Sequence, residues 1–115
     1  MSDEMVIFTR VFDLLAWLVP KSEAFPRSHR HSVTPRLLNT ALDVQDRLCD
    51  AQARRGALRL DALREADAAL ARLRIYLRLA HHLRWLSDGQ YEHVSHRVAE
   101  VGRLLGGWIK QSGSH

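Results

Sequence analysis

Apolar residues recur at intervals of three and four along almost the whole chain, and this spacing is the strongest constraint on its fold. The clearest case is a heptad seam in the last quarter, formed by Tyr91, Val94, Val98, Val101, Leu105 and Trp108. This spacing places side chains on one face of an α-helix, whereas a half-buried strand needs alternation at every second residue. The sequence therefore predicts a helical protein.

Four segments of this kind follow one another, separated by short connections. They run from about residue 4 to 19, from 32 or 34 to about 54–56, from about 60 to 86, and from about 90 to 110. Pro20 is expected to kink or end the first segment, because proline lacks an amide donor and clashes with the preceding turn. A basic last turn followed by Gly56 is a typical helix end. We predict an all-α chain, with one domain over residues 1–115 folded as an antiparallel up-down four-helix bundle.

The third segment has two apolar sides and therefore more apolar surface than a single small bundle needs, whereas the apolar residues of the first form one wide face. The predicted core face of the first is Met5, Phe8, Phe12, Leu15 and Val19, widened by Ile7, Val11, Leu14 and Leu18. The third has a core stripe of Leu63, Ala66, Leu70, Leu73, Leu77 and Ala80, and a second stripe on another side of Ile75, Leu79, Leu83 and Leu86. In the fourth, Ala99, Gly102 and Gly106 form a strip of small residues suited to close packing. The second stripe and the glycines are features that suit an oligomer.

The charge of the chain is positive and is carried almost entirely by arginine. The formal net charge is +4, and only two of the 17 basic residues are lysines. Arginine presents several donors in a planar fork that fits phosphate and carboxylate groups, so a polyanionic partner is plausible. The candidate phosphate contacts are Arg27, Arg30, Arg36, Arg74, Arg78, Arg97 and Arg103. The simpler alternative is a solvated surface in which acidic residues neutralise the arginines.

The first connection concentrates this charge. Its sequence AFPRSHRHSVTPR, residues 24–36, contains two prolines and no acid. The prolines predict a rigid joint between two helices that holds Arg27 and Arg30 at one end of the bundle.

Signatures of catalysis are absent from the sequence. It has no HExxH, no GxSxG and no phosphate-binding loop, and its one cysteine, Cys49, is expected to be a small core residue. His93 and His96 lie three residues apart on one helical face, but without a second matching pair. We therefore expect no catalytic residue, no bound metal and no cofactor. A metal-dependent bundle enzyme that uses His81, His93 or His96 is the least favoured alternative.

No segment predicts membrane insertion or export. The longest apolar run, residues 14–19, is far too short to span a bilayer. The amino end carries Asp3 and Glu4 instead of a basic stretch followed by an apolar one. We expect a cytoplasmic protein that does not contact a membrane.

Three blocks, in order, resemble one known family. They are W-L-x-P…FPRS-x-R from Trp17 to Arg30, LR-x-Y-LRLA from Leu73 to Ala80, and QYEH…EVGRLLGGW-x-K from Gln90 to Lys110. The chain is similar over about residues 13–110 to Avd, the accessory variability determinant of diversity-generating retroelements. That family is akin to the four-helix-bundle proteins encoded in ribosomal-RNA intervening sequences.

This resemblance implies a non-catalytic accessory protein that assembles into a positively charged, pentameric barrel. Its implied partners are the reverse transcriptase of the retroelement and the template RNA, with cDNA as a further possible partner. Its implied role is to support the error-prone cDNA synthesis of mutagenic retrohoming. The alternative is an oligomeric structural or protein-interaction bundle without nucleic-acid binding, whose arginines contact acidic protein surfaces.

Overall fold

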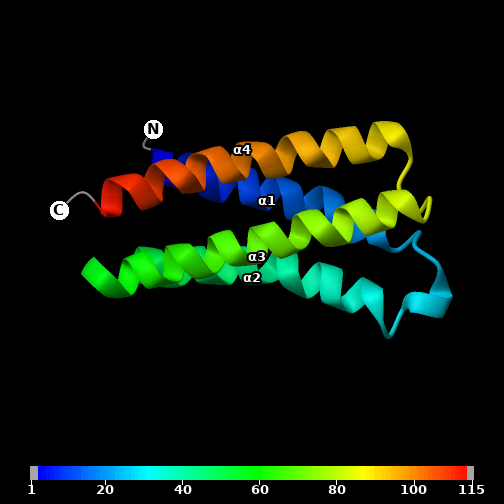
Figure 1. Ribbon diagram of the computed structural model, residues 1–115, viewed down its shortest axis with the longest axis horizontal. Helices are drawn as coiled ribbons and strands as arrows, with labels where there is room; N and C mark the ends of the chain where they lie inside the picture. The colour runs from blue at the N-terminus through cyan, green and yellow to red at the C-terminus, as the bar shows by residue number, and fades with distance from the viewer. Residues whose placement is uncertain (1–2, 114–115) are drawn as a thin grey trace.

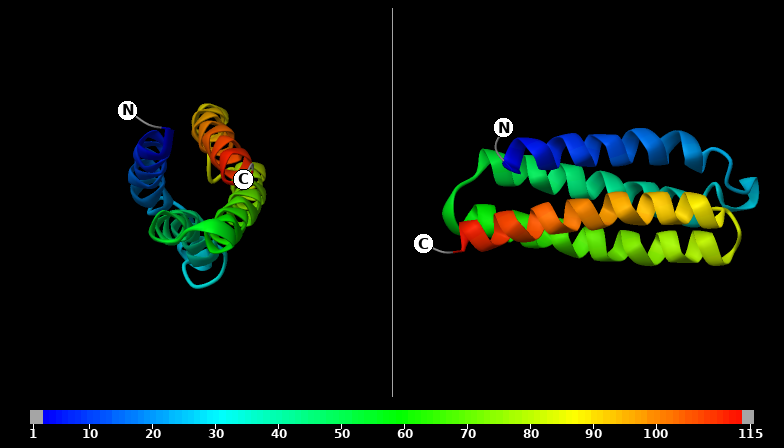
Figure 2. Two further views of the ribbon diagram at one scale, coloured as in Figure 1. Left: turned by 90° about the vertical axis from the view of Figure 1, so that its left-hand side faces the viewer. Right: turned by 90° about the horizontal axis from the view of Figure 1, so that it is seen from above.

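The computed structural model describes residues 3–113, which form four antiparallel α-helices (Figure 1). In chain order these are α1 (Asp3–Ser22), a 3-10 turn η1 (Arg27–His29), α2 (Val33–Ala53), α3 (Gly56–His82) and α4 (Asp88–Ser112). The bundle is elongated, with principal extents of 47 × 25 × 19 Å. Successive helices pack side by side and α4 returns to α1, so the four surround one axis (Figure 2). The predicted all-α bundle is confirmed.

Each helix contributes one apolar stripe to a common core. In α2 the buried residues include the whole predicted stripe, Leu37, Ala41, Val44, Leu48 and Ala51. In α3 they include all six residues predicted for the core stripe, and in α4 the heptad seam is buried except for half-buried Tyr91. Removing a leucine side chain from water contributes about 1.5–3 kcal/mol, which makes this shared core the main source of stability.

The buried face of α1 differs from the predicted one. Ile7, Val11 and Leu14 are almost fully buried, whereas Met5 and Phe12 are exposed. The helix is apolar on nearly all sides, so its periodicity alone could not select a face. The buried stripe is the one formed by aliphatic side chains, which are smaller than that of Phe12 and fit between α2 and α4.

Two further predictions on burial need correction. Cys49 is exposed, because Leu48 occupies the core position and the next residue is turned by about 100° around the helix. Leu86 lies beyond the end of α3 and is fully buried, so it does not belong to the second stripe. The rest of that stripe, Ile75, Leu79 and Leu83, does lie on the outside of the bundle.

Helix boundaries depart from the prediction at three places. α1 continues past Pro20 to Ser22, since a proline in the last turn removes only one backbone hydrogen bond and Pro20 itself is exposed. α3 begins at Gly56, whose φ of 60° reverses the chain after only two intervening residues, Arg54 and Arg55. α3 ends at His82 instead of about residue 86. The start of α4 agrees with the prediction. Ser87 and Gln90 form a reciprocal capping box there, with bonds of 3.1 and 2.9 Å.

Arg59 closes the turn between α2 and α3. Its Nε donates to the carbonyl oxygens of Ala51 (2.8 Å) and Arg54 (2.9 Å), and its guanidinium lies 5.9 Å from the ring centroid of Trp108. The last carbonyls of α2 have no partner within the helix, so this side chain satisfies them. Arg59 is therefore a structural residue.

The glycines of α4 do not meet another backbone within this chain. A Cβ placed on Gly102 would come within 2.5 Å of Arg74 Nη2, the end of a flexible side chain, whereas one on Gly106 would meet nothing within 4 Å. Close backbone packing at this strip therefore does not occur between α4 and its neighbours in the bundle.

Among the described residues, none of the helices is long and apolar enough to cross a membrane.

We expect Gly106→Ala to stabilise the isolated chain by up to about 1 kcal/mol, because alanine has the better helix propensity and its methyl group meets no atom. Thermal unfolding followed by circular dichroism measures the effect, with Leu105→Ala as a control that should lose about 2–5 kcal/mol. A lower melting temperature for Gly106→Ala would contradict the open space beside this glycine.

Arg59→Ala should destabilise the protein by roughly 1–3 kcal/mol, because it leaves the carbonyls of Ala51 and Arg54 without their charged donor. Chemical denaturation measures this loss. Arg64→Ala removes the same charge from an exposed position on α3 and is expected to stay within about 0.5 kcal/mol of wild type. Equal stability of both variants would show that Arg59 does not hold the turn.

Candidate nucleic-acid interface

The seven arginines predicted to contact phosphate all lie at least partly on the surface, but they do not form one site. They belong to three regions: the connection before and at the start of α2 (Arg27, Arg30, Arg36), the middle of α3 (Arg74, Arg78), and α4 (Arg97, Arg103). Only Arg97 is half-buried; the other six are exposed. Their availability to a partner depends on what each one contacts within the chain.

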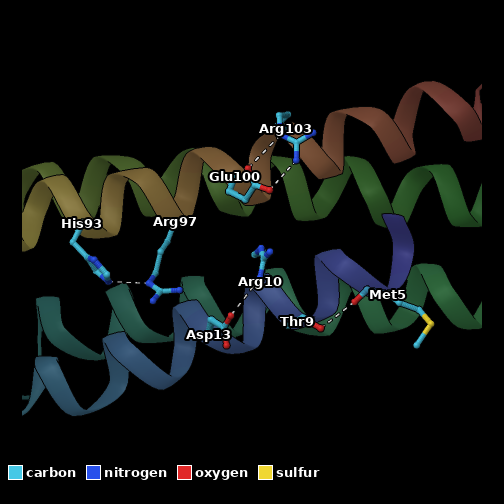
Figure 3. Close-up of polar contacts among 8 residues, drawn as sticks. All are labelled: Met5, Thr9, Arg10, Asp13, His93, Arg97, Glu100 and Arg103. Atoms are coloured by element: carbon cyan, nitrogen blue, oxygen red, sulfur yellow. Dashed lines mark hydrogen bonds and ion pairs between the residues drawn. The ribbon is translucent and has the colours of Figure 1, made fainter. Parts of the chain in front are cut away.

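The two arginines of α4 are engaged within the chain (Figure 3). Arg97 Nε donates to His93 Nε2 at 2.9 Å, and Arg103 donates to both carboxylate oxygens of Glu100, at 2.8 and 3.3 Å. The hydrogen bond from Arg103 holds the pKa of Glu100 below its ordinary value, and Arg10 of α1 acts in the same direction. These arginines lie on a face of mixed charge, which weakens its attraction for a polyanion.

A hollow of about 510 Å³ lies between α1 and α4 on this face. Two histidines, two glutamates and two arginines line it, namely His93, His96, Glu92, Glu100, Arg10 and Arg97. Because Arg97 donates to His93 Nε2, that nitrogen is occupied and cannot bind a metal in this arrangement. Across residues 3–113, no three histidine, cysteine or acidic side chains converge as metal ligands. This geometry gives no support to the metal-enzyme alternative.

The arginines of α3 lie on the outside of the bundle next to α4. Arg74 extends over Gly102 and lines a shallow depression together with Tyr91 and Ser95. Arg78 is exposed one turn further along. Trp85 lies beyond the end of α3, in the loop that precedes α4.

The arginines of the first connection (Arg27, Arg30 and Arg36), like Arg74 and Arg78, have no carboxylate partner among the described residues. Arg27 and Arg30 line a groove between the end of α1 and the start of α2, whose apolar wall includes Phe25 and Leu38. One acid, Glu23, lies on the wall of the same groove.

Aromatic rings join this connection to the loop between α3 and α4, a contact that the sequence did not predict. The ring of Trp85 lies 5.4 Å from that of Phe25 and 5.0 Å from that of His29, measured between centroids. Nearby, His81 stacks on Tyr91 at 4.3 Å. His81 Nε2 also lies 2.7 Å from Asp88 Oδ1, and this hydrogen bond holds the pKa of Asp88 below its ordinary value. Both loops thus lie together at one end of the bundle (Figure 1), which we call the connector end: residues 23–32 and 83–87.

Arg84, in the second of these loops, has a left-handed backbone with φ of 68°. Gly56 is the other described residue with a positive φ. A residue other than glycine in this region costs about 1–2 kcal/mol, because its Cβ approaches a carbonyl oxygen. This strain is not apparent from the sequence, since the loop lacks the glycine that usually marks such a turn.

The fold and the family of the chain agree with this description. The chain superposes on the 1.70 Å crystal structure of a protein of unknown function from the S23 ribosomal protein family of Bacteroides thetaiotaomicron VPI-5482, with a TM-score of 0.87. The match covers 95% of this chain and 99% of that one at 15% identity, so it shows a shared fold. No curated protein matches the sequence. The model of the bAvd-like family matches residues 5–112, almost the entire length, and the chain therefore belongs to the bAvd-like family.

Proposed function

We propose that this protein is a non-catalytic accessory factor of a diversity-generating retroelement, acting in the cytoplasm. In this role it binds the reverse transcriptase and the template RNA and supports mutagenic cDNA synthesis. Membership of the bAvd-like family over residues 5–112 is the observation that carries the proposal. The distribution of charge on the bundle supports it.

Phosphate recognition fits five of the seven candidates better than the other two. Arg27, Arg30, Arg36, Arg74 and Arg78 are exposed and make no ion pair among the described residues, so binding a phosphate would not require breaking one. In contrast, Arg103 would have to leave Glu100 first. We therefore rank these five candidates first, and Arg97 and Arg103 last.

Self-association is part of the proposal, with the pentamer of the resembling family as the expected state. Ile75 is 69% exposed and continues through Leu79 and Leu83 as an apolar stripe on α3. A second stripe runs along α1 through Met5, which is 60% exposed, and Phe12, which is 66% exposed. Apolar stripes of this length on a small protein favour contact with another protein surface, either a second copy or the polymerase.

A protein-interaction bundle without nucleic-acid binding is the second candidate. The observation that favours it is the mixed charge of the face between α1 and α4, where Arg10 pairs with Asp13 and Arg103 with Glu100. Such a surface suits another protein better than a polyanion.

The double charge reversal Arg27→Glu with Arg30→Glu should weaken binding to structured RNA by at least about tenfold, because the variant repels the phosphates that the wild type attracts. A filter-binding titration at several salt concentrations measures it. The wild-type affinity should fall steeply with salt, and the double variant should have a shallower slope by about 0.7–0.9 for each lost phosphate contact.

The matched control is Arg64→Glu with Arg72→Glu, which changes the net charge equally from exposed positions on α3. It should weaken binding much less than the connector variant. Absence of RNA binding by the wild type at low salt would refute the RNA part of the proposal. Co-purification of the reverse transcriptase without RNA binding would instead establish the protein-interaction bundle.

A further inference from the structure

The end of α3 has a backbone conformation that a glycine would adopt at lower cost. Trp85 N–H donates to the carbonyl of Ala80 at 2.8 Å, and Arg84 N–H donates to that of His81 at 3.0 Å. These two bonds define a Schellman motif, whose left-handed position is usually glycine. Here that position is Arg84, with φ of 68°.

Packing of the two following residues holds this turn in place. Leu86 is fully buried in the core, and Trp85 packs against the core and against the rings of Phe25 and His29. Arg84 itself is exposed, and within residues 3–113 its side chain makes no hydrogen bond or ion pair. The positive charge of Arg84 helps to lower the pKa of Asp88, but the turn itself uses the backbone of Arg84 and its guanidinium stays exposed, so the strain points to a role for the side chain outside folding.

The surroundings of Arg84 indicate what that role is. The connector end carries three exposed arginines, Arg27, Arg30 and Arg84, against a single carboxylate, Glu23, within its two loops. The nearest acid beyond them, Asp88, already accepts a hydrogen bond from His81. The half-buried ring pair of His29 and Trp85 joins the two loops that carry these arginines.

Arginines and partly exposed aromatic rings are the two components of a single-strand binding surface. Guanidinium groups contact the phosphates, and an aromatic ring stacks on a base, which is possible only where the base is unpaired. A double helix encloses its bases and would use the arginines alone. The combination favours an unpaired strand over a duplex.

We propose that the connector end binds an unpaired stretch of RNA, with Arg84, Arg27 and Arg30 on the phosphates and the His29–Trp85 pair stacked on a base. This inference rests on the proposed function, because it locates and specifies the RNA binding that the function requires. Arg84 is the residue that the strained turn adds to the site.

The decisive variant is Arg84→Gly, which removes the charge and relieves the strain together. Its melting temperature should equal or exceed that of the wild type, while its affinity for a fluorescent 12-nucleotide oligouridylate should fall at least fivefold in anisotropy titrations. Arg84→Lys keeps a charge in the same backbone and should retain most of the affinity. Arg64→Ala, on the exposed side of α3, is the matched charge control and should change affinity less than twofold.

The stacking component has its own variant. His29→Ala should weaken binding of the single-stranded oligonucleotide at least threefold but leave binding of a 12-base-pair RNA duplex unchanged, because only the unpaired base stacks. Circular dichroism confirms that each variant is folded before its affinity is compared.

The possible outcomes separate this inference from the proposed function. If the wild type binds neither RNA, both are overturned. If it binds RNA but Arg84→Gly and His29→Ala bind as tightly as wild type, RNA is held elsewhere and only this placement fails. If the wild type prefers the duplex, the assignment to an unpaired strand is wrong. A drop in melting temperature of Arg84→Gly would show that the guanidinium serves the fold, which would also overturn the assignment.

Discussion

The burial of one aliphatic stripe from each helix is the constraint on which the rest of this structure depends. Four helices around one axis have room for one face each, so Ile7, Leu37, Leu70 and Leu105 and their neighbours fill the core. Apolar residues on any other face must then remain outside. This geometric limit leaves the apolar stripes of α1 and α3 exposed on the surface of the single chain.

Because the core has room only for apolar side chains, polar residues lie at the ends and along the outer faces of the helices. Arginine has two different roles there. Arg59 turns its guanidinium inward to the last carbonyls of α2 and stabilises a turn. Arg84 contributes only its backbone to a turn and leaves its guanidinium in solvent. Two arginines of the same charge, each beside a helix end, therefore differ in function because of what their side chains contact.

The surfaces of the bundle also differ in whether their arginines have partners within the chain. Along α4 the arginines bind Glu100 and His93, so a partner meets a surface of mixed charge. At the connector end Arg27 and Arg30 make no ion pair among the described residues, and the rings of His29 and Trp85 join its two loops. The positive net charge of the whole chain does not reveal this difference between the two surfaces.

Periodicity in the sequence by itself determined the four helices and the core stripes of α2, α3 and α4, because these depend on neighbours within a few residues of the chain. The three sequence blocks that resemble Avd also indicated the family, and the match of the bAvd-like family model over residues 5–112 confirmed it. The arginine contacts of α4 are local, because Arg103 and Glu100 lie three residues apart and Arg97 and His93 lie four apart. Tertiary structure alone decided which face of α1 is buried, since a helix that is apolar on nearly all sides shows little preference until its neighbours are placed. It also joined Trp85 to His29, which are far apart in the chain and come into contact only because the bundle brings their two loops to the same end.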